Sequence, residues 1–85
     1  MGMNPLHDEV RAIVADTLTL ANDASIDTFR LGEHPNWDSM RHMQMLMALE
    51  TRFAIRFPSY VIPKLADVDS ISAAVTEYQG RKTAK

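Results

Sequence analysis

The sequence predicts a small all-α protein, a bundle of three main helices with a short, irregular helical segment before the last one. Apolar residues recur at spacings of three and four in three stretches of the chain, which is the helical period. No stretch shows the strict apolar-polar alternation that is typical of a strand. With 85 residues, 46% of them hydrophobic, the chain is sized for one domain with one modest core.

The first helix is expected over residues 5–20. Pro5 suits a first helical turn, because its missing N–H would have no partner there anyway. Asp8 and Glu9 would lie near the positive end of the helix dipole. The apolar stripe that faces the core consists of Leu6, Val10, Ile13, Val14, Thr17 and Leu18.

Residues 21–38 are predicted to form a long loop. They lack a sustained apolar period and are rich in turn formers such as Asn22, Asp23, Gly32 and Pro35. A loop of this length in so small a protein often has a function. We expect the loop to be held on the core by its scattered apolar residues, which are Ile26, Phe29, Leu31 and Trp37.

The second helix is the best-defined element. Asp38 or Ser39 is a suitable N-cap, and the following run to Phe53 contains no glycine or proline. Methionine, leucine, alanine, glutamate, glutamine and arginine dominate this run, and all favour helices. The residues that we expect in the core are Met45, Leu46, Leu49 and Phe53.

The C-terminal third is broken by prolines before its last helix. Pro58 and Pro63 limit residues 59–65 to one short, irregular helical turn. Asp69 or Ser70 is expected to cap the final helix, whose apolar face includes Val68, Ile71, Ala74, Val75 and Tyr78.

Gly80 is expected to end this last helix. We therefore predict an ordered core over residues 5–79 and a basic tail, residues 80–85, that frays.

Composition excludes several classes of function. Cysteine is absent, which rules out disulfides, thiol nucleophiles and cysteine-rich zinc sites, and favours an intracellular, cytoplasmic protein. The N-terminus does not resemble a signal peptide, and no apolar run approaches the length of a membrane span. A formal net charge of −2 offers no general attraction to nucleic acid or to an anionic membrane. No cluster of histidine and acidic residues has the spacing of a metal site.

The segment from Trp37 to Phe53 carries the strongest functional signal. It resembles the phosphopantetheine site of acyl carrier proteins, in which Asp-Ser-Leu opens the second helix. The matching residues are Asp38-Ser39-Met40, with methionine in place of leucine, followed at the family's spacing by Ala48-Leu49-Glu50 and Phe53. The resemblance extends over nearly the whole chain, and it implies the four-helix fold of that family.

By this resemblance, Ser39 is the attachment point for a 4′-phosphopantetheine arm that comes from coenzyme A. The chain would then be a non-catalytic, monomeric carrier of acyl or aminoacyl thioesters. Its partners would be a phosphopantetheinyl transferase, a loading enzyme, and a downstream acyltransferase or synthase. Asp38 would help to hold the transferase's metal ion or would fix the local turn. A helix N-terminus also favours the phosphodiester that results.

Other interpretations of Ser39 stay open at this point. It could be a plain N-cap that accepts a hydrogen bond from the N–H of Arg41 or His42. It could form a nucleophilic pair with His42, although no third member or oxyanion hole is evident, and we expect His42 to be a surface histidine. Finally, the chain could be an interaction module that has the carrier fold and acts without the arm.

A face for partner proteins is predicted beside Ser39, and it comprises Trp37, Met40, Arg41, Met43 and Met47. The three methionines share one side of the helix, where they either fill the core or form an exposed apolar patch. Glu50 is the only acidic residue from position 40 to 57, whereas many fatty-acid carriers have an acidic second helix. This departure favours a specialised pathway, such as polyketide or aminoacyl assembly, over general fatty-acid synthesis. The sequence does not choose among fatty acyl, malonyl, aminoacyl and D-alanyl cargo.

Overall fold

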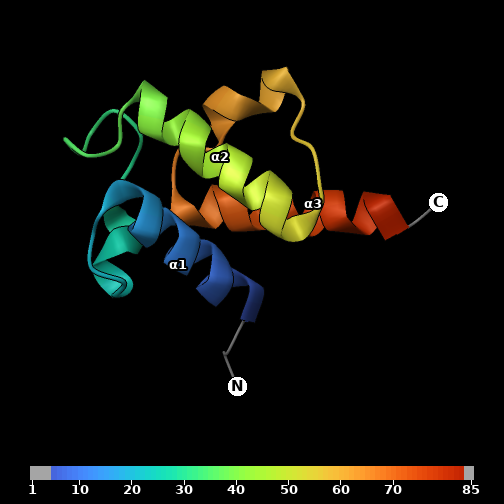
Figure 1. Ribbon diagram of the computed structural model, residues 1–85, viewed down its shortest axis with the longest axis horizontal. Coiled ribbons are helices and arrows are strands. Elements are labelled where there is room, and N and C mark those ends of the chain that lie inside the picture. Colours follow the sequence, from blue (N-terminus) through green and yellow to red (C-terminus); the bar gives the residue numbers. More distant parts are fainter. Residues whose placement is uncertain (1–4, 84–85) are drawn as a thin grey trace.

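The computed structural model describes residues 5–83, and these residues form helices and connecting loops without any strand. Three α-helices and two short 3-10 helices follow one another along the chain (Figure 1): α1 (Pro5–Leu18), η1 (Ala24–Thr28), α2 (Ser39–Phe53), η2 (Ser59–Lys64) and α3 (Val68–Thr83). The predicted all-α bundle, with a short irregular segment between its last two main helices, is confirmed.

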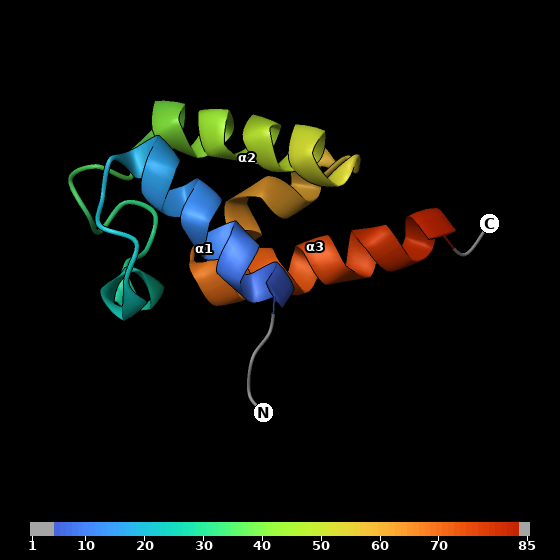
Figure 2. The same ribbon diagram turned by 60° about the horizontal axis from the view of Figure 1, so that its bottom comes forward.

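The three α-helices pack together with α1 at the centre of the contacts. α1 lies against both α2 and α3, and it runs opposite to α2 in both views (Figures 1 and 2). The long loop with η1 crosses one end of the bundle, and η2 leads from the end of α2 back to the start of α3. The start of α2 therefore lies at the same end of the molecule as the long loop.

The core is built from the faces that the sequence pattern indicated. On α2, the predicted core residues are all at most 6% exposed, namely Met45, Leu46, Leu49 and Phe53. Ile26 and Trp37 of the long loop are fully buried, and Phe29 and Leu31 pack against the core as partly buried residues. The prediction that these apolar residues hold the loop on the bundle is confirmed.

α1 ends two residues earlier than expected. Its last helical residue is Leu18, because Thr19 adopts the left-handed region with φ of 58°. The N–H of Leu20 then donates to the carbonyl of Ala15 at 2.9 Å, which closes the helix end. The sequence pattern missed this end because Leu20 continues the apolar run.

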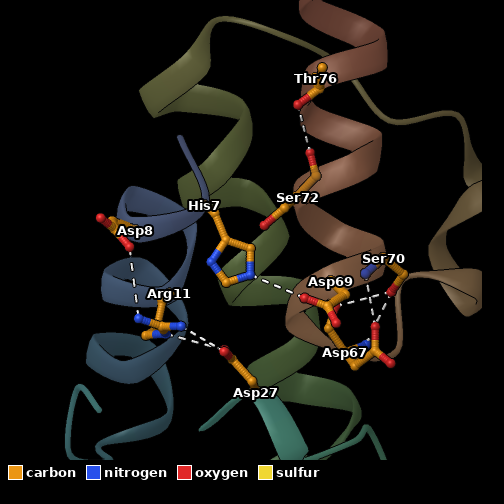
Figure 3. Close-up of polar contacts among 9 residues, drawn as sticks. All are labelled: His7, Asp8, Arg11, Asp27, Asp67, Asp69, Ser70, Ser72 and Thr76. Carbon is orange, nitrogen blue, oxygen red and sulfur yellow. Dashed lines mark hydrogen bonds and ion pairs between the residues drawn. The ribbon is translucent and has the colours of Figure 1, made fainter. Parts of the chain in front are cut away.

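Within the long loop, η1 is a helical turn that the apolar pattern did not predict, since five residues are too few to show a period. Asp23 caps it by accepting a hydrogen bond from the Ser25 N–H at 2.9 Å. Arg11 of α1 then binds the Asp27 carboxylate through two hydrogen bonds of 3.1 and 2.6 Å (Figure 3). This ion pair ties the loop to α1.

The start of α3 differs from the prediction, because Asp67 takes the capping role that was expected of Asp69 or Ser70. The Asp67 carboxylate accepts from the Ser70 N–H at 2.8 Å, and the Ser70 hydroxyl in turn accepts from the Asp67 N–H at 3.2 Å (Figure 3). The hydrogen bond from the Ser70 N–H is the largest influence that lowers the pKa of Asp67. Asp69 instead contacts His7 of α1 at 3.1 Å.

The end of α3 also differs, because the helix continues through Gly80 to Thr83. A glycine stops a helix by adopting a positive φ, and Gly80 does not have one. In a helical conformation, glycine only weakens the helix, by about 1 kcal/mol relative to alanine. The last two residues of the predicted frayed tail, 84–85, lie outside the described residues.

Candidate functional site

Asp38 closes the start of α2 and is the N-cap residue of this helix. Its backbone is extended, and its carboxylate accepts a hydrogen bond from the Arg41 N–H at 2.9 Å. The Asp38 carbonyl accepts from the His42 N–H at 2.9 Å, which is the first hydrogen bond of the helix. The Arg41 guanidinium also lies 3.6 Å from the Asp38 carboxylate.

Ser39 is the first residue of α2, and it is exposed. The interpretation of Ser39 as a plain N-cap is wrong, because the N–H groups of Arg41 and His42 both bind Asp38. The Ser39 hydroxyl has no hydrogen-bond partner within residues 5–83. The hydroxyl is therefore accessible at the surface of the molecule and is available for reaction.

The backbone around Ser39 favours a negatively charged group. The N–H groups at the first turn of an α-helix point out of its end, where the helix dipole is positive. Asp38 binds the third and fourth of these N–H groups, which belong to Arg41 and His42. The N–H groups of Ser39 and Met40 have no partner in the described part of the chain. A phosphate ester on the Ser39 oxygen would lie next to these two donors.

His42 was expected at the surface, but it is buried, with 3% of its surface exposed. Its Nδ1 accepts a hydrogen bond from the Trp37 Nε1–H at 3.0 Å, and its Nε2 lies 3.2 Å from the Ile62 carbonyl oxygen. Both ring nitrogens thus have partners other than Ser39, and the ring is not placed to act as a base on the serine. Burial lowers the pKa of His42, and the hydrogen bond to Ile62 partly opposes this shift.

Trp37 is fully buried, so the prediction that it belongs to an exposed partner face is wrong. Its backbone N–H donates to the His34 carbonyl at 2.9 Å, and its own carbonyl accepts from the Gly32 N–H at 3.1 Å. An indole ring is the largest apolar side chain available, and its burial here fixes the segment that leads into Ser39.

Met40, Met43 and Met47 are 71%, 44% and 60% exposed, and we call these three residues the methionine stripe. Of the two interpretations of this face, core filling is therefore wrong and an exposed apolar patch is correct. Arg41 lies beside the stripe and is partly buried, with its guanidinium next to Asp38.

The charges of α2 are mostly engaged with other parts of the protein. The Glu50 carboxylate accepts a hydrogen bond from the Phe57 N–H at 2.9 Å, so it turns back toward the loop after the helix. Arg52 pairs with Glu9 of α1. The outer face of α2 consequently presents methionines and no acidic cluster.

Comparison with known proteins identifies the family. An acyl carrier protein of Thermosynechococcus vestitus is 30% identical over 71 residues, which make up 84% of this chain and 88% of that protein. The chain belongs to the acyl carrier protein family. Acyl carrier proteins of Akkermansia muciniphila and Campylobacter jejuni are 29% and 30% identical, over 94% and 75% of this chain and 100% and 83% of the respective relatives. No protein-family model and no solved structure gives a significant match.

Membership of this family supports a general carrier role and the helical fold seen here. Among the described residues, no group of three or more histidine and acidic side chains could hold a metal ion. The same residues include no helix with the length and hydrophobicity needed to cross a membrane.

The sequence placed Asp38 and Ser39 correctly at the start of α2 but missed the contact between Trp37 and His42. These residues are five apart, with the helix start between them, so no helical spacing relates them. The signal that could have shown the burial of His42 is its helical spacing, because it lies three, four and seven residues before the core residues Met45, Leu46 and Leu49.

Proposed function

We propose that this chain carries acyl or aminoacyl groups as thioesters on a 4′-phosphopantetheine arm attached to the Ser39 oxygen. The observation that supports the proposal most directly is the exposed Ser39 hydroxyl, which has no hydrogen bond within the described chain and lies at the first turn of α2. In a member of the acyl carrier protein family, an exposed serine hydroxyl without a hydrogen bond to the described residues is suited to carry the phosphopantetheine arm.

The attachment would be a phosphoryl transfer from coenzyme A. The Ser39 oxygen attacks the phosphorus next to the pantetheine, a new P–O bond forms, and the bond to the leaving 3′,5′-ADP breaks. The hydroxyl proton is released in the same reaction. The free N–H groups of Ser39 and Met40 favour the charge of the phosphodiester product. The arm supplies a terminal thiol, and the protein presents it to other enzymes.

Asp38 has a structural role at this site, because its cap fixes the turn that exposes Ser39. We propose that its carboxylate also helps to hold the transferase's metal ion, as the resemblance implies. Asp38→Asn separates the two roles, since asparagine is as good an N-cap as aspartate but carries no charge. We expect this variant to fold normally and to be modified more slowly at Ser39. An unchanged rate would remove the metal-binding role.

The arm is tested by incubating the purified protein with coenzyme A and a broad-specificity phosphopantetheinyl transferase, and then measuring the intact mass. We expect the mass of one phosphopantetheinyl group to be added to the wild type and none to Ser39→Ala. Ser59→Ala is the matched control, because Ser59 is another exposed serine at the start of a helical segment. Absence of the added mass, or its persistence in Ser39→Ala, would refute the proposal.

We further propose that the methionine stripe and the neighbouring Arg41 form the face on which partner enzymes dock. Flexible methionines can adapt to several partners, and an apolar face without an acidic cluster fits partner surfaces that are not strongly basic. Met47→Glu should lower kcat/KM for modification of Ser39, whereas Ala12→Glu, at an exposed position of α1, should not. Equal effects of the two substitutions would contradict this face.

The second candidate function is an interaction module that uses the carrier fold without the arm. The exposed methionine stripe is the observation that favours it, because such a patch can bind a partner irrespective of Ser39. In that case Ser39→Ala would retain full activity in cells while Met47→Glu would lose it. The carrier function predicts that both variants lose activity.

A further inference from the structure

Three segments of the chain meet at the ring of His42. Trp37 comes from the loop before α2, His42 lies on the first turns of α2, and Ile62 belongs to η2. The indole N–H of Trp37 donates to Nδ1 of His42 at 3.0 Å, and Nε2 of His42 lies 3.2 Å from the Ile62 carbonyl. These two contacts link the loop, α2 and η2 through the side chain of His42.

The partners define the protonation state of His42. An indole N–H is only a donor and a carbonyl is only an acceptor. Nδ1 must therefore be the acceptor and Nε2 must carry the proton, which makes the ring neutral. A protonated ring would direct a second N–H at the indole N–H, and the contact with Trp37 would be lost. The Nε2–H of the protonated ring would still donate to the carbonyl of Ile62.

The ring is also close to the proposed attachment site. Trp37 is two residues before Ser39, and His42 is three residues after it, on the same helix. The Trp37 side chain is fully buried and anchors the segment that ends at the Asp38 cap. Any change at the Trp37–His42 contact therefore acts on the turn that exposes Ser39.

We propose that neutral His42 is a positioning residue that holds the Trp37–Ser39 segment in the form needed for attachment of the arm, and that protonation of its Nδ1 releases this segment. The proposal rests on the proposed function for the consequence at Ser39, whereas the contact and its release concern the protein without any arm.

The direction of the pH dependence follows from burial. The titratable and charged side chains on the three segments around the ring are Arg30, Glu33, His34, Asp38, Arg41, Glu50, Arg52, Tyr60 and Lys64. None of them is a cause of the lowered pKa of His42, which arises from burial. A histidine whose pKa is lowered in the fold stabilises the fold fully above its unfolded pKa of about 6.5. This contribution is lost as the pH falls through the lower, folded pKa.

The first experiment uses NMR on the unmodified protein. We expect the His42 ring to show the Nε2–H tautomer and a midpoint below that of a free histidine. The amide signals of Trp37 and Ser39 should shift with the same midpoint, and exchange of the Trp37 indole N–H should accelerate below it. The Nδ1–H tautomer, or signals of Ser39 that do not follow the titration of His42, would overturn the proposal.

The second experiment separates positioning from simple packing. His42→Gln can offer one acceptor and one donor but cannot titrate, whereas His42→Leu offers neither. His34→Gln, in the loop before α2, is the matched control. We expect the Ser39 signals to stop responding to pH in His42→Gln and to keep responding in His34→Gln. A response that persists in His42→Gln would refute the role of the ring.

The third experiment measures modification of Ser39 at pH 7.5, with the folded fraction of each variant checked by circular dichroism. His42→Gln should be modified at close to the wild-type rate, and His42→Leu several-fold more slowly. Equal rates for folded His42→Leu and wild type would overturn the proposal. If no variant, including the wild type, gains mass, the carrier function itself fails, while the NMR titration still decides whether His42 holds the segment.

Discussion

Replacing Asp38 with alanine removes the carboxylate that caps α2. Its oxygen accepts the Arg41 N–H at 2.9 Å, and loss of such a cap typically costs about 1 kcal/mol, within a range of about 0.5–2 kcal/mol. The ion pair with Arg41, at 3.6 Å, is exposed and contributes about 1 kcal/mol at most. We therefore expect Asp38→Ala to lower the free energy of unfolding by about 1–2 kcal/mol.

Asp38→Asn isolates the hydrogen bond from the charge. Asparagine keeps the side-chain oxygen and caps as well as aspartate, so this variant should lose only the electrostatic part. Urea denaturation, followed by circular dichroism, measures the difference. With a slope of about 1 kcal/mol per molar urea for a small protein, the midpoint of Asp38→Ala should lie about 1 M below that of Asp38→Asn. Equal midpoints for the two variants would show that the cap contributes nothing and that only the charge matters.

Three more predictions concern the bundle around the site. Leu49→Ala should cost about 2–5 kcal/mol in urea denaturation, because Leu49 is fully buried, and a loss below about 1 kcal/mol would contradict its place in the core. Gly80→Ala should stabilise α3 by about 0.5–1 kcal/mol, since a Cβ there meets open space at a helical φ. Gly32→Ala should destabilise the protein, because Gly32 has a φ of 85°. Thermal melts that rank these two variants the other way would refute this prediction. Asp67 has a lowered pKa, so the stability that it contributes is present above its unfolded pKa of about 4 and is lost as the pH falls through its folded pKa. In Asp67→Asn, the free energy of unfolding should therefore depend less on pH in that range. An unchanged dependence of the unfolding free energy on pH would contradict this prediction.

The sequence was sufficient for the elements that rest on a repeating pattern. The core face of α2 at Leu46, Leu49 and Phe53 follows from helical spacing, and the structure buries all three. The position of Ser39 at the start of α2 follows from the polar pair Asp38-Ser39 before an uninterrupted helical run. Such local patterns depend on residues that are neighbours in the chain.

The sequence was insufficient to predict the role of a residue where that role depends on a contact with a residue far away in the chain. Asp67 rather than Asp69 caps α3, since Asp67 reaches both the Ser70 N–H and the Arg30 guanidinium, which lies 37 residues away. His42 was predicted at the surface as a polar residue, although it shares the helical spacing of Met45 and Leu46; the carbonyl that accommodates its buried ring, that of Ile62, is 20 residues further along the chain. Gly80 does not end α3, because its φ is not positive and the helix continues to Thr83.

The buried Trp37 has a practical consequence for any study of this carrier. The chain contains one tryptophan, and its indole lies two residues before Ser39, with its N–H bound to a titratable ring. The tryptophan fluorescence of the molecule therefore originates beside the place where the arm would be attached. Loading of Ser39, docking at the start of α2 and protonation of His42 could each be followed by the emission of the unlabelled protein, in real time.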